Sequence, residues 1–261
     1  MPIVIVKRLS WIVAAIISVL VTVMLFLPAS WLGLVVEKQS RGRLSLGDIQ
    51  GTFWQGSAFI GVAADGRGPV TPLFPGRFQW HISPMLLLGQ IRLELENPAS
   101  LSVPVKLAGN FSQWQLSPAV LLLPPERLEG LGAPLNTIGP TGILHLSWND
   151  LLFSRTSGPL SVTGHVQLEM AEMASRLSPV KPLGSYQMAF DLRGTEADMQ
   201  LSTMKGPMML EGAGKMLSGR FQFSGKAWAQ AGQEAKLANL LNLLGQRRSD
   251  GDKDVIALEF K

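Results

Sequence analysis

Two kinds of hydrophobic pattern divide this chain: one continuous apolar run near the amino terminus, and short alternating segments in the remainder. From Trp11 to Leu27 no residue is charged, and only Ser18 and Thr22 are polar. A helix rises about 1.5 Å per residue, so the distance from Trp11 to Trp31 would be about 30 Å, the hydrocarbon thickness of a bilayer. The run therefore predicts a transmembrane helix with an indole at each membrane interface.

From Leu44 onward, apolar and polar residues alternate in short segments separated by glycine and proline. In residues 90–96, three aliphatic residues alternate with Arg92, Glu94 and Glu96, which is typical of a half-buried strand. The same pattern predicts strands at 44–53, 57–64, 77–82, 101–116, 142–148, 160–173, 185–193, 198–203, 207–211, 219–228 and 255–260. Because these strands are short, sequential and joined by turn residues, we expect an antiparallel meander.

Two segments interrupt the strand pattern with helical signals. Residues 124–131 open with two prolines, which predicts a short helical turn. In residues 232–244 one helical face is marked by four leucines: Leu237, Leu240, Leu241 and Leu244. Gly245 follows, where a left-handed cap is expected. Residues 246–254 form a polar run before the last strand. Outside the anchor we expect at most two helices longer than two turns.

The predicted fold class is mainly β: one amino-terminal transmembrane helix followed by a large antiparallel, curved β-sheet with one or two short helices. Lys7 and Arg8 precede the apolar run, which favours a cytoplasmic amino terminus, although three basic residues between 38 and 43 follow it. We therefore assign residues 1–10 to a cytoplasmic tail, 11–32 to the transmembrane anchor and 33–261 to an exported β-rich domain.

A cleavable signal peptide is the alternative interpretation of the amino terminus. The apolar run exceeds the usual length of about 7–15 residues for such a peptide. Leu27 also stands two positions before Ala29, where a small residue is required for cleavage. We therefore expect the segment to be retained.

Composition narrows the classes of function. The 261 residues include no cysteine, which excludes a thiol nucleophile and a thiolate metal site and is ordinary for a bacterial periplasmic domain. The formal net charge is +4, and removing Lys7 and Arg8 leaves +2 for the exported part. No long basic run with interleaved aromatic residues occurs, so we expect no nucleic-acid partner.

The polar residues do not form a catalytic motif. Three histidines lie in predicted strands, without metal-ligand spacing to another histidine or acid: His81, His145 and His165. No G-x-S-x-G elbow occurs. The acid pairs Glu94 with Glu96 and Glu169 with Glu172 have spacings that strand and loop faces produce routinely. We expect no enzyme, no cofactor and no metal site.

Three segments together resemble the type II secretion system protein N family of Gram-negative bacteria. They are the anchor ending in LPASWL followed by LGDIQGTFWQGSA (residues 46–58), RLEGLGAPLNTIGPTGILHLSW (127–148), and GQEAKLANLLNLLG (232–245). The resemblance implies a single-pass inner-membrane protein with a periplasmic domain, accessory to the machine that exports folded proteins across the outer membrane. It implies other inner-membrane components of that system as partners and carries over no catalytic residue.

Residues 80–95, WHISPMLLLGQIRLEL, are also similar to the strand units of AsmA-type membrane-tethered proteins. That resemblance implies an alternative function in lipid handling or envelope maintenance. An interaction module leaves one sheet face polar, whereas a lipid trough needs a continuous apolar concavity. The polar second face of residues 91–96 favours the interaction module.

Two turns are candidates for the contact surface. Gly51 and Gly56 bracket a tight hairpin in which Phe53 and Trp54 would point to opposite sheet faces. Trp54 is then a core residue or, alternatively, a contact with a partner or the membrane. The turn NTIGPTG at residues 136–142 is rigid and predicted to be exposed. The candidate contact residues are therefore Trp54, Asn136, Thr137 and Pro140.

Overall fold

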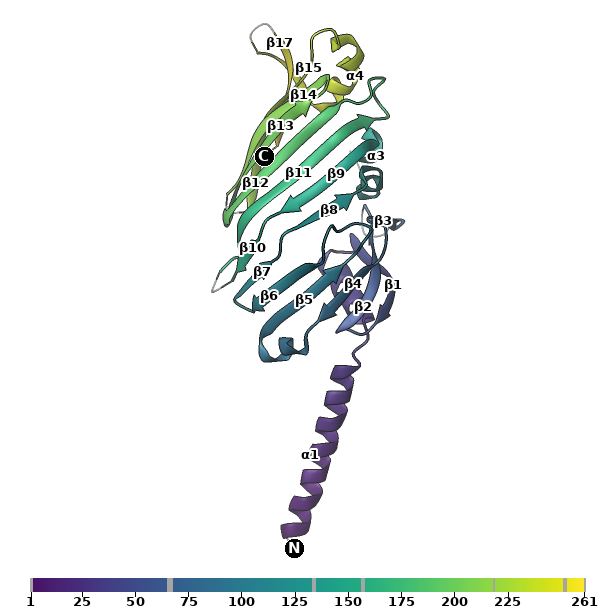
Figure 1. The fold of residues 1–261 in the computed structure, drawn as a ribbon, viewed down its shortest axis with the longest axis vertical. Coiled ribbons are helices and arrows are strands. Elements are labelled where there is room, and N and C mark those ends of the chain that lie inside the picture. Colours follow the sequence, from purple (N-terminus) through teal and green to yellow (C-terminus); the bar gives the residue numbers. More distant parts are fainter. Residues whose placement is uncertain are drawn as a thin grey trace.

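A computed structural model describes residues 2–64, 68–132, 135–155, 158–217, 219–250 and 253–260, and these form one large antiparallel sheet with few helices. Helix α1 (Pro2–Leu25) projects from one end of the domain, and α4 (Glu234–Leu244) lies at the other (Figure 1). The other helical segments are α2 (Ser30–Gln39), η1 (Pro84–Leu88), η2 (Pro125–Leu131) and α3 (Leu135–Ile138).

The sheet contains 17 strands within the described residues. They are β1 (Leu44–Gly51), β2 (Gln55–Val62), β3 (Thr71–Pro72), β4 (Phe78–Ile82), β5 (Gln90–Glu96), β6 (Val105–Asn110), β7 (Gln113–Leu116), β8 (Ala119–Leu123) and β9 (Pro140–Trp148). They continue with β10 (Leu151–Ser154), β11 (Ser161–Ser175), β12 (Gly184–Gly194), β13 (Glu196–Lys205), β14 (Met208–Leu217), β15 (Arg220–Ala229), β16 (Gln246–Asp250) and β17 (Lys253–Phe260).

The topology is an antiparallel meander, as the turn spacing predicted. β9 and β10 act as one interrupted strand, because both pair with the same edge of β11, at Val166 opposite Trp148 and at Thr163 opposite Leu152. β7 and β8 form the next interrupted strand, since they pair with β10 and β9 respectively. From β11 the sheet continues in chain order to β15, which pairs with β17, and β16 lies beyond β17.

Two strand predictions were wrong in detail. The single strand predicted at 101–116 is a hairpin, because the Asn110 side chain accepts hydrogen bonds from the main-chain N–H groups of Ser112 and Gln113 and turns the chain. The polar run at 246–254 contains β16, which pairs with β17. A strand at the end of a sheet can pair through its main chain without an alternating apolar pattern.

The sheet has an apolar face and a polar face between β9 and β15. Directly paired residues share a face, so the ladder registers place five apolar side chains in one row: Trp148, Val166, Phe190, Met199 and, opposite Gly214, Phe223. The neighbouring row on the other face holds small and polar residues: Ser147, Gln167, Ala189, Gln200, Ala213 and Ser224. Met199 and Phe223 are buried in one core cluster with Tyr186 and Leu201.

Helix α4 covers the apolar face at the far end of the sheet. Its buried leucines Leu237, Leu240 and Leu241 pack in a cluster with Ala227 and Ile256 of the sheet, which confirms the predicted apolar helix face. The left-handed cap predicted at Gly245 is wrong, since its φ of 175° is extended. Glycine is required there because a Cβ would overlap the Ala257 carbonyl oxygen of β17.

The amino-terminal helix differs from the prediction of one helix reaching Trp31. α1 ends at Leu25, and α2 begins at Ser30 after a short break. Ala29 is buried and Leu32 packs beside it against the sheet, so the helix break separates these residues from α1. In the part of the chain that the structure describes, no helix meets the combined length and hydrophobicity needed to cross a membrane, and the transmembrane assignment stays a prediction. Apart from α1, only α2 and α4 among the α-helices of the described residues exceed two turns.

Candidate functional site

The candidate functional site is the junction between α1 and the hairpin of β1 and β2, where side-chain and main-chain hydrogen bonds join the two. We call residues 24–29 together with residues 51–56 the helix–sheet junction. The indole Nε1 of Trp54 donates a hydrogen bond to the Met24 carbonyl oxygen at 2.7 Å. That carbonyl belongs to the last turn of α1, where main-chain oxygens have no partner within the helix. Trp54 therefore acts as a cap for the helix end.

Main-chain contacts extend the hairpin by a short extended segment. Phe53 N donates to Leu27 O (2.7 Å), Ala29 N donates to Gly51 O (3.2 Å), and Pro28 pairs with Thr52 as an antiparallel bridge. The segment after α1 is thus bonded to the sheet and is not a free linker. A helix joined in this way transmits its orientation to the domain.

The two glycines of the hairpin permit this close packing, as predicted. Gly51 has a φ of +89°, which favours glycine, and it pairs directly with Gly56. A Cβ on Gly56 would lie 2.6 Å from Cζ2 of Trp80. The Thr52 N–H closes the turn by donating to Gln55 O at 2.8 Å.

Phe53 and Trp54 do not point to opposite sheet faces. Both lie in the turn between the strands, and their rings pack edge to face with centroids 5.1 Å apart. Trp54 is half-buried and belongs to none of the core clusters of the described residues, so the hypothesis of a core Trp54 is wrong. Its position follows from the turn geometry, which strand alternation does not describe.

A small hydrophobic core packs against the helix–sheet junction. Trp80 of β4 is only 8% exposed, clusters with Ala29 and Ala58, and donates from Nε1 to the Phe53 carbonyl oxygen at 3.1 Å. Helix α2 packs on the same core, since a Cβ on Gly33 would lie 2.5 Å from the Ile49 side chain. The junction is therefore held by packing as well as by hydrogen bonds.

An ion pair secures the open edge of β1. Asp48 has a φ of +47° at an irregularity of the strand, and its carboxylate pairs with Arg77. Hydrogen bonds from Arg77, and then from Gln50, hold the pKa of the Asp48 carboxyl below its usual value. Arg77 also lies 4.7 Å above the ring of Phe59. The strained residue and the charge discourage pairing of a further strand at this edge.

The turn at residues 136–142 is exposed at Asn136, Thr137 and Thr141, but not at Pro140. Asn136 and Thr137 are exposed in α3, whereas Pro140 is buried as the first residue of β9 and pairs with Ser175. The Ser175 hydroxyl donates to the Ile138 carbonyl oxygen at 2.6 Å, and the Arg176 guanidinium donates to that of Asn136. Pro140 thus does not fit the predicted contact role, because strand pairing covers it.

The structure does not bring Trp54 and the Asn136 turn together. Trp54 precedes the start of β2, whereas Ala64 follows its end and lies beside Gly132, just before α3. A strand rises about 3.3 Å per residue, so the two turns lie near opposite ends of β2. They are separate surfaces.

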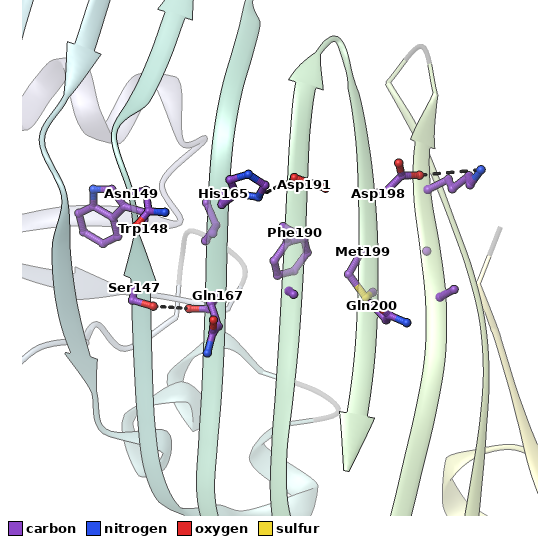
Figure 2. A pocket seen from close by; sticks show the side chains of 15 residues that line it. Ser147, Trp148, Asn149, His165, Gln167, Phe190, Asp191, Asp198, Met199 and Gln200 are labelled. Atoms are coloured by element: carbon purple, nitrogen blue, oxygen red, sulfur yellow. Dashed lines mark hydrogen bonds and ion pairs between the residues drawn. The ribbon is translucent and has the colours of Figure 1, made fainter. Parts of the chain in front are cut away.

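The polar face carries a shallow hollow of about 480 Å³ across β9 and β11–β14 (Figure 2). It forms because small side chains alternate with glutamines along the row, with Ala189 and Ala213 next to Gln167 and Gln200. Ser147 donates to the Gln167 carbonyl oxygen at 3.4 Å, so this hydroxyl is engaged with the main chain. The hollow is open and lined by both polar and apolar surface, and its described contacts include no activated nucleophile.

A row of histidine, acidic and basic residues borders the hollow on one side. His165 Nδ1 lies 2.6 Å from Asp191, Arg193 lies 3.2 Å from Asp191 and 3.4 Å from Asp198, and Lys215 lies 3.9 Å from Asp198. The ion pairs of Arg193 and Lys215 with Asp191 and Asp198 are exposed, and such pairs contribute about 0–1 kcal/mol each. They set the surface charge of the sheet more than its stability.

Each histidine faces an acid across a strand pair, which the sequence spacing could not reveal. The pairs are His81 with Glu94, His145 with Glu169, and His165 with Asp191. Across the ranges that the structure describes, no three acids and histidines lie close enough to hold a metal ion.

Comparison with known proteins adds one finding. A family model described as type II secretion system (T2SS), protein N, matches residues 42–255, from just before β1 into β17. No curated protein and no solved structure matches the chain. The matched region includes the junction hairpin, the Asn136 turn and α4.

Proposed function

The chain belongs to the type II secretion system protein N family, and we propose that it is an accessory component of that system in the bacterial inner membrane. α1 anchors it with the amino terminus in the cytoplasm, and the sheet lies in the periplasm. It supports the export of folded proteins across the outer membrane through contacts with other inner-membrane components, without catalysing a reaction.

The helix–sheet junction is the observation that carries this proposal. A tethered enzyme or binding domain needs only a flexible linker, whereas here the Trp54 indole and the two main-chain hydrogen bonds of the Pro28–Thr52 bridge tie the end of α1 to the sheet. The side chains of Ile16 and Val19 in α1 are exposed and apolar, as lipid-facing residues are. An anchor bonded to a long sheet is suited to hold a contact surface at a set distance from the membrane.

We expect an Ile16→Asp/Val19→Asp variant to lose both membrane association and export. Two aspartates near the centre of a membrane helix cost about 5–7 kcal/mol for insertion. A strain lacking the wild-type gene should regain secretion with the wild-type chain and not with this variant. Fractionation and assay of exported enzymes in the medium measure the two effects.

Ser18→Ala is the matched control, because it changes the same helix without adding charge. Normal export and normal fractionation of the double aspartate variant would contradict the anchor. Alkaline phosphatase fused after Lys261 should be active, and an inactive fusion would overturn the orientation.

We expect an Asn136→Ala/Thr137→Ala variant to fold normally and copurify less with inner-membrane secretion components. Both side chains are exposed, so their loss removes no core packing. Loss of polar contacts in an interface should weaken association by about 1–2 kcal/mol. Copurification, the melting transition and secretion are measured together.

Thr195→Ala, in the exposed turn between β12 and β13, is the control for this variant. Full copurification and full secretion with the double variant would place the contact surface elsewhere.

Lipid handling is the second candidate function, and the row of apolar side chains from Trp148 to Phe223, with Gly214 between Met199 and Phe223, is the observation that favours it. The polar opposite face fits both candidates. Mass spectrometry of lipids extracted from purified protein separates them, since a lipid-handling sheet would retain a bound lipid after removal of bulk membrane.

A further inference from the structure

Exposed apolar side chains gather at one end of the sheet. η1 presents Met85, Leu87 and Leu88, and Leu88 is 76% exposed. Phe111, at the tip of the β6–β7 hairpin, is 62% exposed. The two segments are neighbours, because a Cβ on Gly89 would lie 3.8 Å from the Phe111 ring. We call these four residues the apolar edge.

The apolar edge lies at the end of the domain from which α1 leaves. The Trp54 indole is bonded to the Met24 carbonyl oxygen, and the Trp54 carbonyl oxygen accepts a hydrogen bond from Ile82 N at 2.7 Å. Ile82 ends β4, and η1 begins two residues later at Pro84. Figure 1 shows this short helical turn, between β4 and β5, at the end of the sheet nearest α1.

The edge is a built structure and not a loose loop. Ser83 caps η1 by accepting a hydrogen bond from Met85 N at 3.3 Å, and Gly89 ends it with a φ of +83°. The Asn110 side chain fixes the hairpin tip beside Phe111. The fold therefore holds four large apolar side chains toward solvent, an arrangement that marks an interaction surface.

We propose that the apolar edge inserts into the periplasmic leaflet of the membrane that α1 enters. This inference rests on the proposed anchoring by α1. Proximity to the helix favours lipid as the occupant: Phe26, directly after α1, is exposed as well, and the hydrogen bonds from Met24 through Trp54 to Ile82 place the end of α1 at the same end of the sheet as the edge.

Basic residues beside the edge agree with a lipid surface. Arg92 is exposed, and its carbonyl oxygen accepts a hydrogen bond from Ser83 N. Arg155 is also exposed, and its main-chain N–H donates to Ser112 O at 2.7 Å, next to Phe111. If the edge enters the membrane, the side chains of Arg92 and Arg155 would lie at the level of the lipid phosphates. Insertion gives the sheet a second attachment besides α1 and so sets its tilt on the membrane.

Single-cysteine labelling tests this inference on the full chain, which contains no natural cysteine. Leu88→Cys and Phe111→Cys carry an environment-sensitive fluorophore in vesicles of phosphatidylethanolamine and phosphatidylglycerol, with nitroxide-labelled lipids as quenchers. Ile16→Cys reports on the anchor, and Thr137→Cys, on the exposed turn of α3, is the reference in water. Circular dichroism melting checks that each variant is folded.

We expect blue-shifted emission and strong quenching by shallow nitroxide lipids at Leu88 and Phe111, and neither effect at Thr137. Water-like emission at both edge positions, with Ile16 quenched, would refute insertion of the apolar edge and would support the anchoring by α1. Quenched edge positions with an unquenched Ile16 would support insertion of the edge into lipid and refute the anchoring by α1. A blue shift at the edge positions that appears only when secretion proteins are added, and not with lipid alone, would overturn the inference in favour of a protein partner.

Discussion

Replacing Trp80 with alanine should lower the free energy of unfolding by about 3–5 kcal/mol, the usual cost of deleting a buried tryptophan. Trp80 is nearly fully buried beneath the helix–sheet junction and clusters with Ala29 and Ala58. The substitution leaves a cavity and also removes the hydrogen-bond donor of the Phe53 carbonyl oxygen. The melting transition and urea unfolding of the full chain in detergent measure the loss.

Trp54→Ala is the matched comparison. It removes the same residue type at the residue that follows Phe53, whose carbonyl oxygen Trp80 binds. Trp54 is half-buried and packs on Phe53 at the end of α1. Its removal should cost about 1–2 kcal/mol, from one hydrogen bond and one aromatic contact, and should loosen the attachment of α1, which the main-chain bonds of residues 27–29 still hold to the sheet. Equal destabilisation by the two variants would show that Trp54 belongs to the core after all.

Leu237→Ala should destabilise the opposite end of the domain by about 2–5 kcal/mol. Leu237 is 0% exposed in α4 and packs in the cluster with Ala227 and Ile256. Alanine preserves the helix, so the loss comes from packing and not from helix propensity. Thermal and urea unfolding monitored by circular dichroism provide the measurement.

Leu243→Ala is the control, since Leu243 lies in the same helix and is 68% exposed. Its effect should be within about 0.5 kcal/mol of wild type. Similar losses from the two leucines would mean that α4 packs on the sheet through a different face.

Local patterns were sufficient for much of the fold, as β5, the hairpin at Gly51 and Gly56, and the leucine face of α4 illustrate. In each of these the side-chain period, or the need for glycine, is set by the segment itself. The contact residues were harder to predict. Asn136 and Thr137 are exposed as expected, whereas Pro140 is covered by pairing with Ser175, a residue far along the chain.

The sequence by itself determined that the chain is mainly β, that an apolar segment precedes the sheet, and that the chain resembles the secretion family which the family model then matched. Only the tertiary structure decided where that segment ends, that Trp54 caps α1, that β16 pairs with β17, and that η1 and Phe111 form one apolar edge near α1. The physical reason is the range of the interactions. Periodicity records which side of a segment is buried, whereas these features depend on hydrogen bonds and packing between residues that are distant in the chain.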